Sequence, residues 1–257
     1  NLFKKHQIQY VFLKGAALLI SKPYDTINER MVGDIDILVS EKDIYRAQKL
    51  LNDKGFFKII QEENHFLKEI ISHRHLSRIT HPDYIASIEL HRNLLNKKIE
   101  LLNPKDVLNK RIQTKEGYWT PSSHHMWLHA IFDWQYNDNG IIYNSLSMRT
   151  FLDAVNLELK HENFNLKIHP AVTRFYSLCS ILLDRYQNRN YMSSLLFRYK
   201  LMYPCFRRFS NFFIKSLIYL STVLNRIKLV IFSKLYRKRL LENPKMIITK
   251  TFTYFSK

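Results

Sequence analysis

The sequence has little cysteine and no long uninterrupted apolar run. Its two cysteines, Cys179 and Cys205, provide neither a disulfide framework nor the spacing of zinc ligands, and they suit a reducing compartment. The most hydrophobic segment, residues 212–232, contains lysine, arginine and asparagine, so it falls short of the roughly 20 apolar residues of a membrane span. No repeat and no signal-peptide pattern is evident, and we therefore expect a cytoplasmic protein, at most peripheral at a membrane.

Acidic residues are nearly absent from the tail of the chain, residues 185–257. The tail carries 16 lysines and arginines against one acid, Glu242, whereas the rest of the chain has 24 basic and 21 acidic residues. A basic segment that is also rich in tyrosine and phenylalanine is attracted to polyanions, so RNA and an anionic membrane surface are candidate partners. A solvated basic face over a helical core would explain the same composition. Within the tail, residues 212–232 read as a buried or interfacial amphipathic helix.

Two carboxylates stand two residues apart at the start of an apolar run, residues 35–39. On a strand, side chains at positions i and i+2 point to the same face, so Asp34 and Asp36 lie side by side. Neighbouring carboxylates repel one another unless positive charge lies between them. Because hard divalent cations prefer oxygen ligands, we expect this pair to bind a metal ion. Arg30, a few residues earlier, is either a site residue or a structural partner of Asp34 or Asp25.

An earlier apolar run predicts a strand over residues 8–13, and a glycine follows it. Gly15 ends this strand and allows the backbone to approach a ligand closely. Residues 16–21 are predicted as a short helix, whose free N-terminal amides favour phosphate. Lys14 adds a positive charge at the same place, although a solvated strand end would also accommodate a lysine.

A third acid stands inside a predicted hairpin of residues 75–80 and 84–91. In its second arm, Ile88 and Leu90 face one way, while Glu89 lies on the opposite face. A carboxylate in the middle of a strand is unusual on structural grounds alone. It would be explained if Glu89 faced Asp34 and Asp36. His91, on the same face, either packs and hydrogen-bonds behind Glu89 or touches the substrate.

The pattern becomes helical after residue 102. Helices are predicted to begin at Pro104, at Pro121, near Ser147 and at Pro170, the last with Leu182 and Leu183 facing inward. The order of elements predicts an α+β fold with two parts. We expect an α/β domain over residues 1–102 and a helical domain over residues 103–257, which includes the basic tail.

Two pairs of polar residues on the predicted helices have ordinary structural explanations. His125 and His129 lie four residues apart, which is a zinc-ligand geometry. No third ligand is evident, and the glutamate of a metalloprotease motif is absent, so we expect core or surface histidines. Arg149 and Asp153 also lie four apart, and we expect an intrahelical ion pair or an interdomain contact rather than a catalytic role.

Taken together, these motifs resemble the polymerase-β-like nucleotidyltransferase superfamily. Its pattern is a Gly-Ser or Gly-Gly turn on a helix, an Asp-x-Asp strand, and a third Asp or Glu on a later strand. The most similar branch is a bacterial group of uncharacterised nucleotidyltransferases, which the chain resembles over about residues 8–160. The resemblance is carried by Leu13-Lys14-Gly15-Ala16-Ala17, Arg30, Gly33-Asp34-Ile35-Asp36-Ile37-Leu38-Val39 and Ile88-Glu89-Leu90-His91.

The resemblance implies a fold, a reaction and a set of site residues. The fold is a mixed sheet with flanking helices, followed by a mainly helical C-terminal region. The reaction is transfer of a nucleoside monophosphate from an NTP such as ATP to an acceptor hydroxyl, with two Mg²⁺ or Mn²⁺ ions. The implied site residues are the metal ligands Asp34 and Asp36, the third acid Glu89, which binds metal or deprotonates the acceptor, and the nucleotide-binding residues Lys14, Gly15, Ala16 and Arg30.

One departure from the superfamily pattern leaves alternatives open. Position 16 is alanine, where many members have a serine whose hydroxyl helps to hold the phosphate. The first hypothesis is therefore an Mg²⁺-dependent nucleotidyltransferase acting on a small molecule, a glycan precursor or a protein. The second is a toxin-like enzyme acting on tRNA or another RNA. The third is a degenerate, non-catalytic module that docks on polyanions or a membrane surface.

Overall fold

The computed structural model describes residues 2–24, 26, 30–58, 74–161, 164–165, 168–183 and 191–242. The chain divides into two compact units, residues 1–194 and residues 195–257. The first unit contains the sheet together with helices α2 to α9. The separate α/β and helical domains that we expect on either side of residue 102 stay a prediction.

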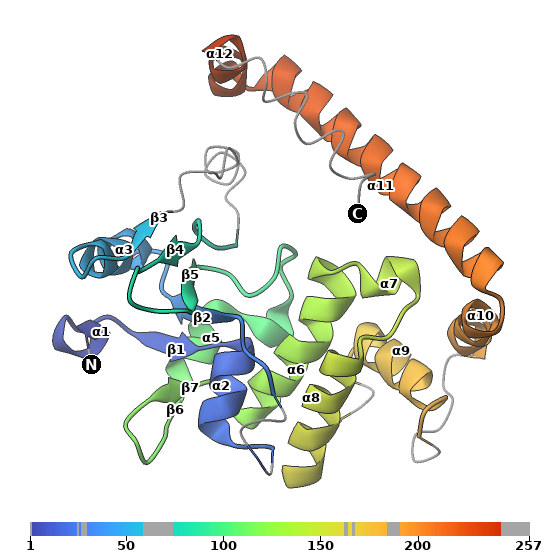
Figure 1. Ribbon diagram of the computed structural model, residues 1–257, viewed down its shortest axis with the longest axis horizontal. Helices are drawn as coiled ribbons and strands as arrows, with labels where there is room; N and C mark the ends of the chain where they lie inside the picture. Colours follow the sequence, from blue (N-terminus) through green and yellow to red (C-terminus); the bar gives the residue numbers. More distant parts are fainter. Residues whose placement is uncertain are drawn as a thin grey trace. The chain divides into compact units, whose positions relative to one another are not determined.

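A mixed sheet of five strands forms the centre of the first unit (Figure 1). Strands β2 and β5 are parallel neighbours, and the other neighbouring strands are antiparallel. The mixed sheet with flanking helices is as predicted. The order across the sheet is β1 (Tyr10–Phe12), β2 (Asp34–Val39), β5 (Ser87–His91), β4 (Ile79–Thr80) and β3 (Phe57–Lys58).

The two faces of the sheet bury different cores, because side chains alternate along each strand. On one face, Ile37 and Val39 pack with the apolar side of α3 (Ile44–Asn52). On the other face, Leu38 packs in a cluster that extends into the helices α2, α6, α8 and α9. Asp34 and Asp36 share the alternation of Leu38, so both carboxylates lie on the helical side of the sheet.

Several helices cover this second face, and α2, α6 and α8 lie side by side (Figure 1). The caps explain why they begin where they do: Asn103, Ser122 and Ser147 each accept a hydrogen bond from a backbone N–H of the first turn. The helices are α2 (Lys14–Ser21), α5 (Pro104–Asn109), α6 (Ser123–Phe132) with the π-helical turn Asp133–Asn137, α7 (Gly140–Tyr143), α8 (Met148–Lys160) and α9 (Pro170–Cys179).

The prediction that the helix beginning at Pro170 buries Leu182 and Leu183 is wrong. Both side chains are exposed, because α9 ends at Cys179 and the helical periodicity ends with it.

Smaller elements complete the first unit. They are α1 (Leu2–Lys5), the 3-10 turn Glu100–Leu102, β6 (Ile112–Gln113) and β7 (Trp119–Thr120).

Long helices make up the described part of the second unit. Helix α10 (Tyr191–Met202) begins in the first unit, and α11 (Pro204–Phe232) and α12 (Lys234–Glu242) follow it. No residue of α11 is buried, so the buried alternative for residues 212–232 is wrong, and the interfacial alternative stays a prediction. None of the described helices combines the length and apolar character that a membrane crossing requires.

Candidate active site

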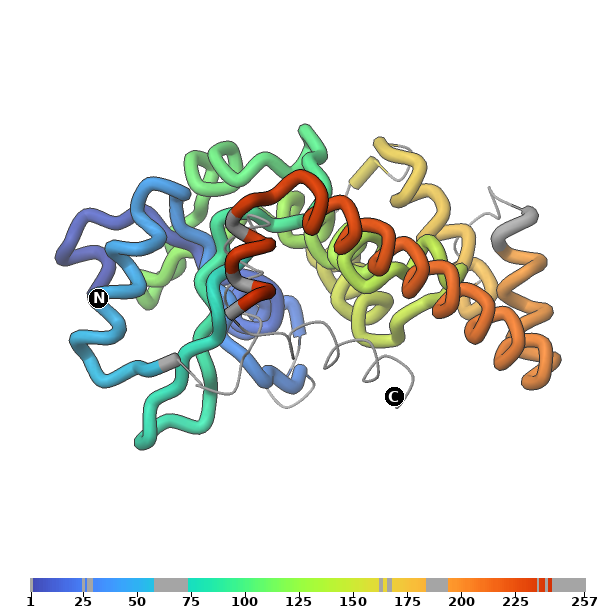
Figure 2. Tube along the Cα trace, turned by 90° about the horizontal axis from the view of Figure 1, so that it is seen from above, coloured from blue at the N-terminus to red at the C-terminus, as the bar shows by residue number. Residues whose placement is uncertain are grey.

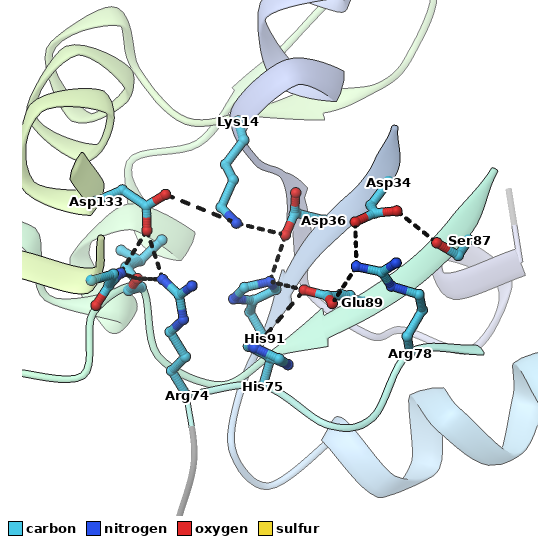
Figure 3. Close-up of polar contacts among 12 residues, drawn as sticks. Lys14, Asp34, Asp36, Arg74, His75, Arg78, Ser87, Glu89, His91 and Asp133 are labelled. Carbon is cyan, nitrogen blue, oxygen red and sulfur yellow. Dashed lines mark hydrogen bonds and ion pairs between the residues drawn. The ribbon is translucent and has the colours of Figure 1, made fainter. Parts of the chain in front are cut away.

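Three carboxylates lie on two parallel strands, on the face of the sheet that the helices cover. Asp36 on β2 stands opposite Glu89 on β5, and Asp34 stands opposite Ser87 (Figure 3). The parallel register places all three acids next to one another, as the alternation along each strand predicts. The sequence-based expectation that Glu89 faces the Asp34 and Asp36 pair agrees with this arrangement.

Asp36 is the most buried of the three acids and has two cationic or hydrogen-bonding partners. Lys14 Nζ donates to its Oδ1 at 3.0 Å, and His91 Nε2 donates to the same oxygen at 2.7 Å. Burial alone would raise the pKa of Asp36, but the hydrogen bond from His91 and the charge of Lys14 outweigh burial and lower it. Asp36 is therefore ionised at neutral pH, as a metal ligand must be.

Glu89 is held in the same ionised state by residues of β5 and the segment before β4. His91 Nε2 lies 3.7 Å from its carboxylate and His75 Nε2 lies 3.9 Å from it. Burial opposes ionisation, yet His91 and His75 hold the pKa of Glu89 well below its usual range. Arg78 lies on its other side, 3.3 Å from Oε1.

Arg78 also connects Glu89 to Asp34. Its guanidinium lies 2.6 Å from Asp34 Oδ2, and Ser87 Oγ donates to Asp34 Oδ1 at 2.7 Å (Figure 3). Asp34 is the most exposed of the three acids, with a side chain 30% exposed. The carboxylate cluster therefore has one cation at each end, Lys14 beside Asp36 and Arg78 beside Asp34. The role of Arg78 has no local signal in the sequence.

Lys14 joins the sheet to the helical region through a further acid, Asp133. Its Nζ lies 4.0 Å from Asp133 Oδ2 at the start of the π-helical turn (Figure 3). Burial lowers the pKa of Lys14, but Asp133 and Asp36 outweigh it and raise the pKa. The backbone of Lys14 has φ of +48°, in the left-handed region that non-glycine residues rarely adopt. Such strain is typical of residues that a functional site holds in place.

No motif in the sequence points to Asp133. Its Oδ1 accepts from Arg74 at 2.6 Å and from Asn137 at 2.5 Å. Burial would raise the pKa of Asp133, but Lys14, His129 and Arg74 hold it well below its usual range. In the structure, the π-helical turn marks this position, because such turns occur often at functional sites and insert an extra residue that redirects side chains.

Gly15 lies in the first turn of α2, beside the loop that precedes β2. A Cβ atom at this position would lie 2.8 Å from Val32 Cγ2, which is closer than real Cβ contacts. Glycine is therefore required for the close approach of α2 to this loop. Ala16 is buried in the same turn, at 9% exposure. Both predicted phosphate-side residues thus lie at the N-terminal end of α2, beside Lys14.

Arg30 is bound to an acid of the helical region, Asp153. Its Nε lies 2.8 Å from Asp153 Oδ1 and its second terminal nitrogen lies 3.0 Å from Oδ2, and Tyr24 also donates to this carboxylate. The third guanidinium nitrogen donates to the carbonyl oxygen of Met31. Of the two contacts expected for Asp153, an ion pair with Arg149 on its own helix or a contact with another part of the fold, the structure shows the second, with Arg30.

A cavity of about 600 Å³ lies between the acid-bearing face of the sheet and the helices. Asp34, Asp36 and Lys14 line one side, and Arg149 and Asp133 line the helical side. Arg149 is exposed at the start of α8. Burial and the charge of Asp133 raise the pKa of Asp138, and the charge of Arg149 partly opposes this rise. The cavity is in the size range of small-molecule sites.

The two histidines of α6 do not form a metal site with the described residues. His125 is paired with the capping residue Ser122, at 2.9 Å between Nδ1 and Oγ. His129 lines the cavity, and its Nε2 finds no hydrogen-bond partner among the residues that the structure describes. Burial lowers the pKa of His129 to about 4, so its imidazole is neutral at neutral pH.

The carboxylate cluster fits a divalent cation. Within the described ranges, Asp36, Glu89 and His91 each offer a ligand atom, and these atoms lie within 4.8 Å of one another. Asp34 adds another carboxylate on the same face of the sheet. Asp34 and Asp36 line the cavity, and carboxylate oxygens match the preference of Mg²⁺ and Mn²⁺.

Comparisons with known proteins give a family and two distant structures. A family described as "uncharacterised nucleotidyltransferase" matches residues 1–166. No curated protein is significantly similar to the chain. One similar structure is the lincomycin-bound lincosamide antibiotic adenylyltransferase LnuA, with 15% identity, a TM-score of 0.38, and coverage of 61% of this chain and 90% of that chain. Another is the antibiotic-resistance factor ANT(2'')-Ia, with 9% identity, a TM-score of 0.43, and coverage of 72% and 90%.

Proposed function

This chain belongs to the family of uncharacterised nucleotidyltransferases, as its motifs predict, and we propose that it transfers a nucleoside monophosphate from an NTP to an acceptor hydroxyl. Pyrophosphate leaves as the new phosphoester bond forms. The observation that supports this proposal best is the register of β2 and β5. In this register Asp36 stands opposite Glu89, and Asp34 and Asp36 both line the cavity.

Asp34, Asp36 and Glu89 are proposed to hold the metal ions. When bound, two Mg²⁺ ions would activate the attacking hydroxyl and stabilise the leaving pyrophosphate. The low pKa of Glu89 favours a role as a ligand over a role as the acceptor of the hydroxyl proton, because a strongly ionised carboxylate is a weak base near pH 7.

The nucleotide phosphates are proposed to lie at the N-terminal end of α2. Lys14 borders the cavity there and carries a full positive charge. Gly15 and Ala16 form the turn beside it. Arg30 donates three of its N–H groups to Asp153 and Met31, which leaves two for a phosphate. The missing hydroxyl at position 16 is thus offset by charge.

Arg149 is proposed as a further cation for the triphosphate. The other arginines of the cavity wall are each held by an acid: Arg30 by Asp153 and Arg74 by Asp133. Arg149 is exposed on the cavity wall, and the described residues give it no ion pair within 4 Å. A guanidinium in this position can turn to a phosphate without breaking an existing buried pair.

The size of the cavity favours a small acceptor, such as a small molecule or a glycan precursor, over a protein or an RNA strand. A test is to incubate the protein with labelled NTPs, Mg²⁺ or Mn²⁺ and cell extract, and then to separate small molecules, protein and RNA. We expect the label in the small-molecule fraction. Label in RNA would favour the toxin-like alternative, and no label in any fraction would favour the non-catalytic module.

The matched variants for this test are Asp36→Asn and Asp53→Asn. Asp53 is exposed at the end of α3, so the same chemical change there should leave transfer unchanged. Asp36→Asn should abolish it, because the buried carboxylate has no substitute. Transfer that survived in Asp36→Asn would show that another site performs the reaction.

A further inference from the structure

Helix α11 exposes a continuous apolar stripe. The helix runs unbroken from Pro204 to Phe232, from orange to red in the tube of Figure 2, and it buries none of its residues. Seven of its exposed large apolar side chains recur every three or four residues, which places these seven on one side of the helix. The members of the stripe are Phe209, Phe213, Leu217, Leu220, Leu224, Ile227 and Ile231.

Acids are absent from α11, and most of its basic residues lie away from the stripe. At about 100° per residue, Lys228 lies next to one edge of the stripe, whereas Arg208, Lys215 and Arg226 lie on the opposite side of the helix. The segment 204–232 contains no aspartate or glutamate. The helix therefore combines an apolar face with a positively charged opposite face that carries no acid, in contrast to the near-neutral first part of the chain.

The composition of the stripe and the charge of the helix favour one class of partner. A second copy of α11 would bring like charges together with no acid to pair them, which costs stability in coiled coils. Single-stranded RNA binds through aromatic stacking platforms, but aliphatic residues predominate in the stripe from Leu217 onward. An anionic lipid surface matches both features, because acyl chains accept the apolar face and the negative surface potential attracts the uniformly positive remainder of the helix.

We propose that α11 lies in the plane of an anionic membrane surface. Its apolar stripe is buried at the boundary between headgroups and acyl chains, Lys228 contacts lipid phosphates beside the stripe, and the positive charges of the opposite face attract the helix to the anionic surface. This inference does not depend on the nucleotidyltransferase activity.

The test is flotation of the full chain with vesicles of phosphatidylcholine, with and without phosphatidylglycerol. We expect binding to the anionic vesicles and little binding to the neutral ones. Leu220→Gln with Leu224→Gln should weaken binding roughly a hundredfold, because each buried leucine contributes on the order of tenfold. The matched control is Ile214→Gln with Ile218→Gln, which removes two apolar residues from the opposite side of the same helix and should bind as wild type.

Several outcomes would overturn the proposal. Equal losses in the two double variants would exclude docking through the stripe, and equal binding to neutral vesicles would exclude the role of the positive charges of α11. RNA binding that persists in Leu220→Gln with Leu224→Gln, together with no vesicle binding, would assign the surface to nucleic acid. A dimer that only this variant dissociates, without vesicle binding, would assign it to a second copy. Far-UV circular dichroism checks that every variant keeps its helix content.

Discussion

The pH dependence of folding tests the burial of His129 in the cavity wall. Burial lowers the pKa of its imidazole from about 6.5 to about 4. Between these two values the unfolded chain binds a proton at this residue and the folded chain does not. The free energy of unfolding therefore falls as the pH falls through this window, and the contribution of His129 is constant above it.

The size of the effect follows from the two pKa values. Between about pH 7 and about pH 5, the difference in proton binding lowers the free energy of unfolding by about 2 kcal/mol. His129→Gln removes this part of the pH dependence and keeps every other titrating group. Urea unfolding at the two pH values should therefore show a loss of stability about 2 kcal/mol smaller in His129→Gln than in the wild type.

A histidine on the surface provides the control. His161 is exposed at the end of α8, and His161→Gln should retain the wild-type pH dependence. If His129→Gln and the wild type lost the same free energy of unfolding between the two pH values, the imidazole would not be buried in its neutral form. The helical wall of the cavity would then differ from the structure.

Three further substitutions test other parts of the site. Asp133→Asn leaves buried Arg74 without its carboxylate, so urea unfolding should show a loss of about 2 kcal/mol. Gly15→Ala should lower both thermal stability and NTP turnover, because the added Cβ collides with Val32. Val32→Ala in the same chain should restore both, and a double variant without restoration would refute the steric cause. Arg149→Gln should raise KM for the NTP about tenfold in steady-state kinetics, with thermal stability unchanged, and an unchanged KM would remove Arg149 from the nucleotide site.

Local periodicity was sufficient to predict the acid-bearing strands. The spacing of two residues fixes Asp34 and Asp36 on one face, and an acid inside an apolar strand signals that Glu89 faces something polar. Proline and asparagine or serine at helix starts likewise predicted the beginnings of α5, α6 and α8. These features depend on residues that are close together in the sequence, so their patterns are visible before folding.

The contacts that surround the acids could not be predicted in the same way. Asp133 and Asp153 each pair with a cation more than 50 residues away, and on their own helices both look like ordinary polar residues. Arg78 precedes β4 without any motif. Which acid each arginine pairs with depends on how the helices pack on the sheet, and local sequence patterns do not contain that information.

The tail illustrates a different limit of prediction. Its charge is visible in the composition and its helical periodicity in the spacing of its apolar residues. Burial, however, depends on what packs against a helix rather than on the helix itself. The apolar periodicity of residues 212–232 fits a core helix and an interfacial helix equally well. The exposure of the apolar stripe excludes the core helix, whereas the interfacial helix stays a proposal.

The most direct test of the central claim compares an NTP labelled at the α-phosphate with the same NTP labelled at the γ-phosphate, using wild type, Asp36→Asn and Asp53→Asn. Nucleotidyl transfer moves the α-label to the acceptor and releases the γ-label as pyrophosphate, in the wild type and in Asp53→Asn alone. Transfer of the γ-label to the acceptor, or α-label transfer that persists in Asp36→Asn, would contradict nucleotidyl transfer by the carboxylates of β2 and β5.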